Sequence, residues 1–273
     1  MERHRAPDCG GAFLSTTSLE TGVVRRLTPM EERAIGEAQN GALLRELRAL
    51  RPEEWDAPTD FDGWRVRDVV AHLLGWAEFF TSSTEFRHQL RAFAPGKKDF
   101  PTTTDEQNEL QVRDRRDLSP RDLQAALEKA LPRFLSFRLR VGRVARVVPF
   151  YAGIIGPSTV GFLMTSVFSR DAFMHRIDIA RATARELELG EWDRRLVADV
   201  ARHWGRRTKA DARLLLSGDA GGDFVLGAGS RARVSGVALE FCRVLTGRAD
   251  PGVIQVQGDR AAATRWLETR VPF

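Results

Sequence analysis

The sequence predicts a helical bundle followed by a small α+β domain. Long amphipathic segments with helical spacing fill the chain up to about residue 205, whereas short apolar runs separated by Gly or Asp follow residue 210. We therefore expect a leader over residues 1–28, a helical domain over residues 29–207 and an α+β domain over residues 208–273. A chain of 273 residues, 42% of them hydrophobic, can bury a core without disulfide bonds.

Two helix starts carry the same local signal, an N-cap hydroxyl followed by proline. Thr28-Pro29 predicts a helix that ends near Pro52, and Ser119-Pro120 predicts one over residues 121–141. Apolar spacing predicts further helices over residues 66–92, 158–184 and 191–205, and a shorter one from about Thr104. We expect loops over residues 56–63, in PGKKDFPTTT, and over the Gly- and Pro-containing residues 142–157.

The end of the chain alternates strand and helix patterns. ARLLLSG, DFVLGAG, ARVSG and VIQVQGD are typical of short strands, while VALEFCRVLTGR and AAATRWLETRV have helical spacing.

Composition and charge argue against several classes of protein. No apolar run approaches the roughly 18 residues of a membrane helix, and MERHRAPDCGG lacks the apolar core of a signal peptide, so we expect a cytoplasmic protein. The net charge is +5, but the arginines are scattered between acids, which is typical of a solvated surface, and we do not expect nucleic-acid binding. Of the two cysteines, Cys9 lies in the leader, and Cys242 lies among apolar residues, where we expect a buried side chain. Any thiol chemistry would therefore use a thiol from outside the chain.

Three polar residues in apolar helical segments are candidates for chemistry. Asp171 and His175 are four residues apart, so their side chains share one helix face. A hydrogen bond or ion pair is the simpler interpretation of this spacing, and shared ligation of a metal is the alternative. His72 in DVVAHLLGW is by itself compatible with a core histidine, but it can supply a third ligand from another helix. The remaining histidines, for which we expect surface or structural roles, are His4, His88 and His203.

Longer segments around these residues resemble a known family. DGWRVRDVVAHLLGW, with the preceding LRALRPEEWDAPT, resembles the first-histidine motif of the mycothiol-dependent maleylpyruvate isomerase family, which is part of the DinB-like superfamily. GPSTVGFLMTSVFSRDAFMHRIDIARAT resembles the second metal motif of that family. FCRVLTGRADPGVIQVQGDRAAATRWL resembles its C-terminal domain, which is similar to a sterol-carrier fold. The resemblance covers roughly residues 30–270, with the motifs in the family's order and spacing.

The resemblance implies a fold and a ligand set. It implies a DinB-like antiparallel four-helix bundle with a C-terminal sterol-carrier-like α/β domain, and a divalent metal, with zinc as the expected ion, bound by His72, Asp171 and His175. The family usually has Glu where this chain has Asp171, and the shorter side chain requires a closer approach. Three protein ligands leave a fourth position open, as in catalytic zinc sites.

Several neighbours of the ligands have two interpretations each. Arg248 in LTGR resembles an arginine that the family directs toward the bound substrate, but it is also a favourable cation at a helix C-terminus. Asp178 either orients a ligand or is an exposed helix acid. Trp76 and Phe79 either line the pocket or, as we expect more, belong to the core.

The implied activity is that of an isomerase or a thiol S-transferase. The thiol of mycothiol would bind as thiolate and attack a small electrophilic substrate. The expected partners are that substrate and the low-molecular-weight thiol, and the expected assembly is a monomer or a homodimer. The alternatives are a non-catalytic small-molecule or lipid carrier and a DinB-like metal-dependent hydrolase that activates water.

Overall fold

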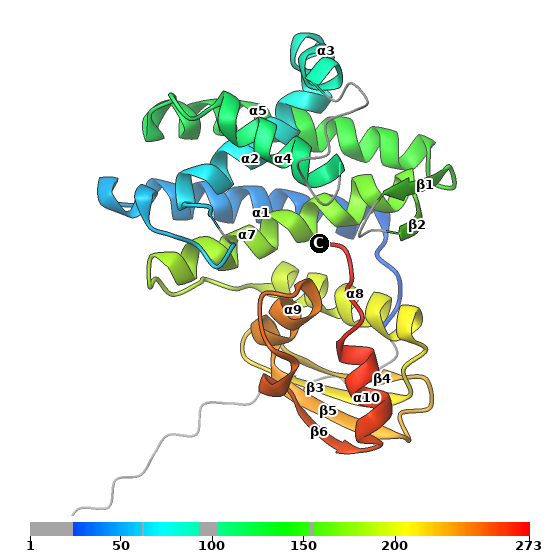
Figure 1. The fold of residues 1–273 in the computed structure, drawn as a ribbon. Coiled ribbons are helices and arrows are strands. Elements are labelled where there is room, and N and C mark those ends of the chain that lie inside the picture. The colour runs from blue at the N-terminus through cyan, green and yellow to red at the C-terminus, as the bar shows by residue number, and fades with distance from the viewer. Residues whose placement is uncertain (1–23, 62, 93–102, 153–155) are drawn as a thin grey trace, which may run out of the picture.

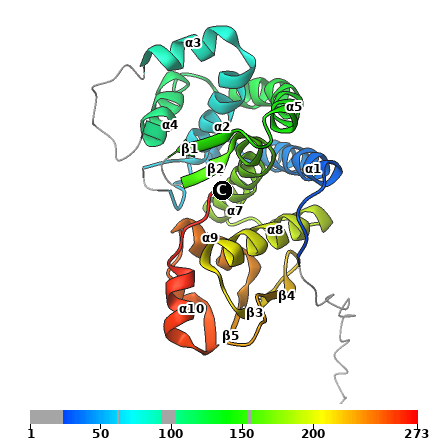
Figure 2. The same cartoon turned by 90° about the vertical axis from the view of Figure 1, so that its right-hand side faces the viewer.

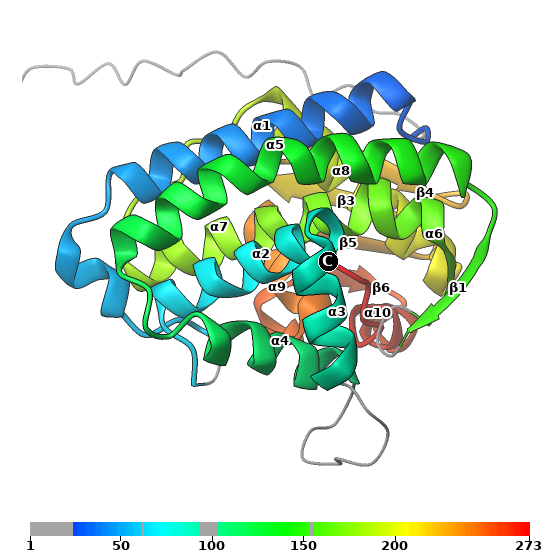
Figure 3. The ribbon, with the colours of Figure 1, turned by 90° about the horizontal axis from the view of Figure 1, so that it is seen from above.

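Four long helices pack around a common core in the first part of the chain (Figures 1 and 3). They are α1 (Pro29–Arg48), α2 (Val66–Thr81), α5 (Pro120–Val144) and α7 (Phe168–Ala182). Helix α5 packs against α1 and α2, and α7 packs against the same two helices. The computed structural model describes residues 24–61, 63–92, 103–152 and 156–273. Most of the predicted leader therefore lies outside the described residues.

Both predicted N-caps are present. The Thr28 hydroxyl accepts a hydrogen bond from the Glu31 N–H, and the Glu31 carboxylate accepts one from the Thr28 N–H, which completes a capping box. The Ser119 hydroxyl accepts from the Asp122 N–H at the start of α5. These caps satisfy N–H groups that the helices leave unpaired and so fix where α1 and α5 begin.

The helix predicted over residues 66–92 is two helices, so this prediction was wrong. Helix α2 ends at Thr81, Ser82 is extended with φ −122° and ψ 118°, and α3 (Ser83–Ala92) follows. The Ser82 hydroxyl accepts a hydrogen bond from the Glu85 N–H. A serine that caps the next helix competes with the continuation of the first one, because its side chain replaces the helical carbonyl as acceptor.

Helix α4 (Thr103–Asp114) begins where the sequence predicts and lies directly on α2. Gly75 makes this approach possible. A Cβ atom at Gly75 would lie 2.4 Å from Cγ of Gln111, which is closer than carbon atoms can pack.

We expect Gly75→Ala to destabilise the protein by about 1–3 kcal/mol, because the added methyl group overpacks the contact between α2 and α4. Gly41→Ala in α1 is the matched control, since its Cβ would meet only the end of the Arg45 side chain, at 3.5 Å. That variant should gain up to about 1 kcal/mol from helix propensity. Urea denaturation measures the free energy of unfolding of both variants. An equal change in Gly75→Ala and Gly41→Ala would contradict overpacking between α2 and α4.

The predicted loop over residues 142–157 is largely structured, and the prediction of a simple connection was wrong. Helix α5 continues to Val144, and β1 (Pro149–Ala152) pairs antiparallel with β2 (Gly156–Thr159). The next helix starts later than predicted, because Ser158 and Thr159 belong to β2 and Thr159 caps α6 (Val160–Phe162).

A π-helical segment, η3 (Leu163–Val167), joins α6 to α7. Such segments interrupt the regular helical hydrogen bonds. The buried Arg138 of α5 donates a hydrogen bond of 2.9 Å to the Met164 carbonyl inside η3, and another to the Ser169 hydroxyl. The α5 side chain thus fixes the backbone that leads into α7.

The second part of the chain contains a four-stranded sheet, as the sequence predicts. Its order is β4-β3-β5-β6, with β3 parallel to β5 and the other neighbours antiparallel. The strands are β3 (Ala212–Ser217), β4 (Gly222–Leu226), β5 (Ala232–Val237) and β6 (Gln255–Gly258), and the later helices are α9 (Ala238–Thr246) and α10 (Arg260–Leu267). The described residues also form the short 3-10 helices η1 (Pro52–Asp56) and η4 (Pro251–Val253).

Helices α8 (Glu191–Thr208) and α9 lie between the four long helices and the sheet (Figures 1 and 2). The fully buried Trp204 of α8 packs in one core with the sheet residue Leu214 and with Phe173 of α7. The buried Arg176 of α7 donates to Asp193 of α8 and to Glu46 of α1. This shared core and ion network hold α7 against the second part of the chain.

In the part of the chain that the structure describes, no helix has the length and apolar character that a membrane crossing requires.

Candidate metal centre

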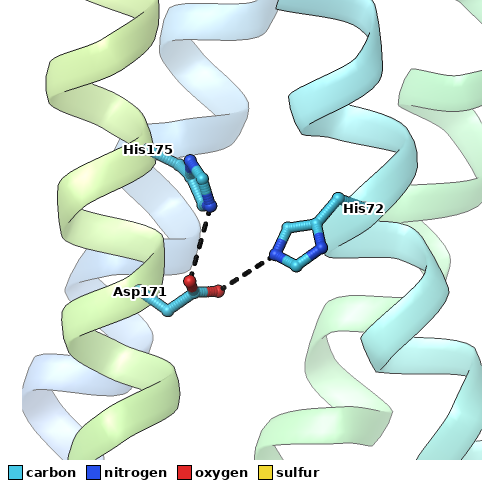
Figure 4. Close-up of side chains that lie close together, drawn as sticks. All are labelled: His72, Asp171 and His175. Carbon is cyan, nitrogen blue, oxygen red and sulfur yellow. Dashed lines mark ion pairs between the residues drawn. The ribbon is translucent and has the colours of Figure 1, made fainter. Parts of the chain in front are cut away.

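His72, Asp171 and His175 converge at the interface of α2 and α7 (Figure 4). His72 points from α2 toward α7, and Asp171 and His175 stand one turn apart on the facing side of α7. His72 is 3% exposed to solvent and His175 is 4% exposed, whereas the side chain of Asp171 is 20% exposed. The helical spacing and the apolar neighbours therefore place all three side chains where the sequence predicts.

Two distances within this cluster are close to those between ligands of one metal ion. Asp171 Oδ1 lies 3.4 Å from His175 Nε2, and Asp171 Oδ2 lies 3.8 Å from His72 Nε2. One ligand atom from each residue lies within 4.8 Å of the others. Two donors each about 2.1 Å from a tetrahedral ion are about 3.4 Å apart. The aspartate thus reaches both rings despite being one methylene shorter than glutamate.

The electrostatics of the cluster favour an ionised Asp171 beside a protonated His175. Burial by itself would raise the pKa of Asp171, but the two histidines outweigh burial and hold that pKa below its usual range. Burial lowers the pKa of His72. For His175, the carboxylates of Asp171 and Asp178 overcome burial and raise the pKa to about 9.

A metal must displace the proton on His175, so we expect metal binding to strengthen as the pH rises toward 9.

Asp178 orients His175. His175 Nδ1 and Asp178 Oδ2 are 2.9 Å apart, and the Asp178 carboxylate is fully buried. A carboxylate that accepts the Nδ1 proton leaves Nε2, on the other side of the ring, free to ligate. The interpretation of Asp178 as an exposed helix acid was therefore wrong.

Arg248 holds Asp178 in turn. Its Nε and Nη2 donate to the two oxygens of Asp178 at 2.9 and 3.1 Å. Arg248 follows Gly247, which ends α9 with φ 86°, so it belongs to the second part of the chain. Its guanidinium also lies over the Phe61 ring, 5.7 Å from the centroid. Arg248 thus connects the C-terminal part to His175 through Asp178.

His72 is enclosed by other groups. Trp64 packs against its ring with a centroid distance of 5.2 Å, and the indole N–H of Trp64 donates to Glu109 of α4 at 2.7 Å. His72 Nδ1 and Gln111 Oε1 are both buried without a hydrogen-bond partner of good geometry. Trp64 is not among the residues that the sequence predicts for the site, although its place in the DGW segment just before α2 was a usable signal.

A cavity of about 680 Å³ opens beside the cluster. His72, Asp171, His175 and Arg248 form part of its wall, together with residues from both parts of the chain. Trp76 and Phe79 also line it, and Trp76 packs against the core of the four long helices as well, as expected. A small molecule in this cavity would lie against the three candidate ligands.

The other histidines of the described residues lie apart from this cluster. His203 accepts a hydrogen bond from Arg170 Nη1 at 3.0 Å, and burial and that arginine lower its pKa to about 3. His88 is exposed and pairs with Asp114. His4 lies outside the described residues.

We expect Cys242 to be unreactive in the folded protein. It is fully buried on α9, and burial raises the pKa of its thiol to about 12, so almost no thiolate forms near neutral pH. Iodoacetamide at pH 8 should alkylate it only after unfolding, which peptide mass mapping distinguishes from reaction at Cys9. Rapid alkylation of Cys242 in the native protein would contradict this.

The structure therefore defines a helical protein with a potential three-ligand metal centre, set in a cavity that a smaller α/β part helps to close. The family model described as the mycothiol maleylpyruvate isomerase N-terminal domain matches residues 37–180, which include all three candidate ligands. The chain belongs to this family.

Two solved structures have a fold similar to that of this chain. The crystal structure of the mycothiol-dependent maleylpyruvate isomerase is similar with a TM-score of 0.54 and 15% identity, covering 87% of this chain and 96% of that chain. A histidine-to-alanine mutant of that isomerase gives a TM-score of 0.51 and 13% identity over the same shares of the two chains. No curated protein sequence matches significantly.

Proposed function

We propose that this protein is a mycothiol-dependent metalloenzyme that isomerises a small electrophilic substrate or transfers a thiol to it. The observation that carries the proposal is the convergence of His72, Asp171 and His175 within 4.8 Å at the wall of a cavity. Membership in a family named for mycothiol and maleylpyruvate isomerase supports the choice of thiol and the reaction class.

The donor set suits a divalent ion, and we propose zinc. Two imidazole nitrogens and one carboxylate oxygen are ordinary zinc ligands, and a three-ligand site leaves a position for a further ligand. When bound there, the ion would supply the acidity that keeps a thiol deprotonated at neutral pH.

The residues of the chain then have distinct tasks. Asp178 accepts a hydrogen bond from His175 Nδ1, so that Nε2 would be available to the ion. Arg248 neutralises Asp178 and ties the C-terminal part to the site. Trp64 packs against His72 and limits the rotation of its ring. When bound in the cavity, the thiol would supply the nucleophile for either reaction, isomerisation of the electrophile or its attachment to the thiol.

We also propose finer assignments of the fold. The ring of contacts among α1, α2, α5 and α7 supports a DinB-like antiparallel four-helix bundle over residues 29–207. The mixed sheet with α9 and α10 supports a sterol-carrier-like domain over residues 208–273. A cytoplasmic location fits a protein that uses a reduced low-molecular-weight thiol.

The test is turnover of a cis-configured enone with and without mycothiol. Protein stripped of metal and reloaded with zinc should act only when both zinc and mycothiol are present. His88→Ala is the matched control for loss of a histidine, because His88 is exposed and does not line the cavity. Turnover that is independent of the thiol would overturn the proposal.

A further inference from the structure

Gln111 of α4 reaches over Gly75 to the candidate ligand His72. His72 and Gly75 are three residues apart on α2, so they share one helix face. The absence of a side chain at Gly75 admits Gln111, because a Cβ atom there would lie 2.4 Å from Cγ of Gln111. Burial lowers the pKa of His72, and an interaction with the Gln111 side chain is among those that oppose burial. The fully buried Gln111 therefore lies beside the imidazole ring.

The two ring nitrogens of His72 face different groups. Nε2 points toward Asp171, whereas Nδ1 lies on the side of the ring away from Asp171 (Figure 4). Nδ1 is buried and has no hydrogen-bond partner of good geometry among the described residues, and the same holds for the side-chain oxygen of Gln111, Oε1. Two buried polar groups on neighbouring side chains are costly when unpaired, and they satisfy each other when one donates to the other.

The Gln111 amide presents its oxygen to His72, because Gln89 of α3 fixes the orientation of that amide. Gln89 Nε2 donates to the Gly75 carbonyl at 3.2 Å and to Glu85 at 2.8 Å. A backbone carbonyl cannot donate, so the amide of Gln89 must point its nitrogen there and its oxygen, Oε1, elsewhere. That oxygen accepts a hydrogen bond of 3.2 Å from Gln111 Nε2. The nitrogen of Gln111 is thus engaged, and its oxygen is left as the acceptor.

We propose that Gln111 is a positioning residue that accepts the Nδ1 proton of His72 and so leaves Nε2 unprotonated toward the metal ion. This inference deepens the proposed function and rests on its metal centre. A neutral imidazole carries one N–H, so an acceptor at Nδ1 selects the tautomer whose Nε2 can ligate. Oδ2 of Asp171 is 3.8 Å from Nε2, which is beyond hydrogen-bond distance, so this carboxylate does not hold the proton on Nε2. The neutral amide thus does for His72 what Asp178 does for His175.

The first test compares two substitutions of Gln111. Gln111→Met has a similar length but no acceptor, so its affinity for zinc, measured by competition with a chromophoric chelator, should fall by about 10- to 100-fold. Gln111→Glu keeps an acceptor and should retain the wild-type affinity to within about 10-fold. The stability of the metal-free protein in urea should follow the opposite order, because a carboxylate is costlier to bury than a thioether. If Gln111→Glu folded but bound zinc no better than Gln111→Met, the role of Gln111 as an acceptor would be contradicted.

The matched control is Gln107→Met. Gln107 Nε2 donates to the same oxygen of Gln89, at 2.9 Å, and its replacement leaves the Gln111 amide in place. We expect the zinc affinity of this variant to be unchanged. Equal losses of affinity in Gln107→Met and Gln111→Met would overturn the proposal, since they would trace the effect to the packing around Gln89.

The second test needs no metal. Long-range proton–nitrogen correlation spectra of the metal-free protein at neutral pH report which ring nitrogen of each histidine carries the proton, and His72→Ala identifies the signals of His72. We expect the proton on Nδ1 in the wild type and a shift of the proton toward Nε2 in Gln111→Met. A wild-type protein with the proton on Nε2 would overturn the proposal.

The outcomes separate the role of Gln111 from the proposed function. A wild-type protein that binds no zinc would overturn the metal centre, and the spectra would still decide whether Gln111 directs the proton of His72. Zinc binding that is equally strong in the wild type and in Gln111→Met would support the metal centre and overturn the role of Gln111.

Discussion

Replacing His72 by alanine is expected to lower the affinity for a divalent metal by more than about 100-fold. Loss of a residue that merely orients a metal ligand commonly costs 10- to 100-fold, so loss of a ligand should cost more. His72 is the one candidate ligand on α2, and without it only Asp171 and His175 on α7 remain. Competition with a chromophoric chelator measures the affinity directly.

The control for this change is His88→Ala. His88 is also a histidine paired with an aspartate, but its side chain is 52% exposed. We expect this variant to bind metal with unchanged affinity and stoichiometry. An equal loss in both variants would mean that metal binds generally to histidines, and full retention in His72→Ala would remove α2 from the site.

Replacing Arg248 by leucine is expected to destabilise the protein and weaken metal binding together. It leaves the fully buried Asp178 carboxylate without its bidentate partner, and breaking a buried pair costs about 3–5 kcal/mol. Since Asp178 orients His175, metal affinity should also fall, by about 10- to 100-fold. Urea denaturation without metal and chelator competition measure the two effects separately.

A second substitution separates charge from packing. The double variant Arg248→Leu, Asp178→Asn buries no unpaired charge, and its asparagine carbonyl can still accept from His175 Nδ1. It should therefore be more stable than Arg248→Leu alone. If the two substitutions lowered the free energy of unfolding additively, the coupling between Arg248 and Asp178 would be contradicted. Arg231→Leu is the matched control, because its pair with Asp259 is 54% and 33% exposed and should contribute at most about 1 kcal/mol.

Features that depend on neighbouring residues were predictable from the sequence. The caps at Thr28 and Ser119 involve partners three residues away, so their signal is local. The face shared by Asp171 and His175 follows from helical periodicity. Spacing alone left these residues as either an ion pair or a metal site, and only the resemblance to a family joined them to His72.

Features that depend on distant partners were not predictable in the same way. Whether Asp178 is exposed or buried is decided by Arg248, which lies 70 residues further along the chain. The β1–β2 pair depends on hydrogen bonds between two strands. The cavity beside the candidate ligands combines residues from both parts of the chain, so it appears only in three dimensions.

The central claim is that His72, Asp171 and His175 hold one divalent ion with a position open to a thiol. Visible and near-ultraviolet absorption of the cobalt-substituted protein, titrated with mycothiol, tests it most directly. We expect one cobalt per chain and an intense thiolate-to-cobalt band that saturates at one mycothiol per site and is lost in His72→Ala. Stoichiometric cobalt with a spectrum that mycothiol leaves unchanged would contradict the thiol site, and a wild-type protein that binds no cobalt would contradict the metal centre itself.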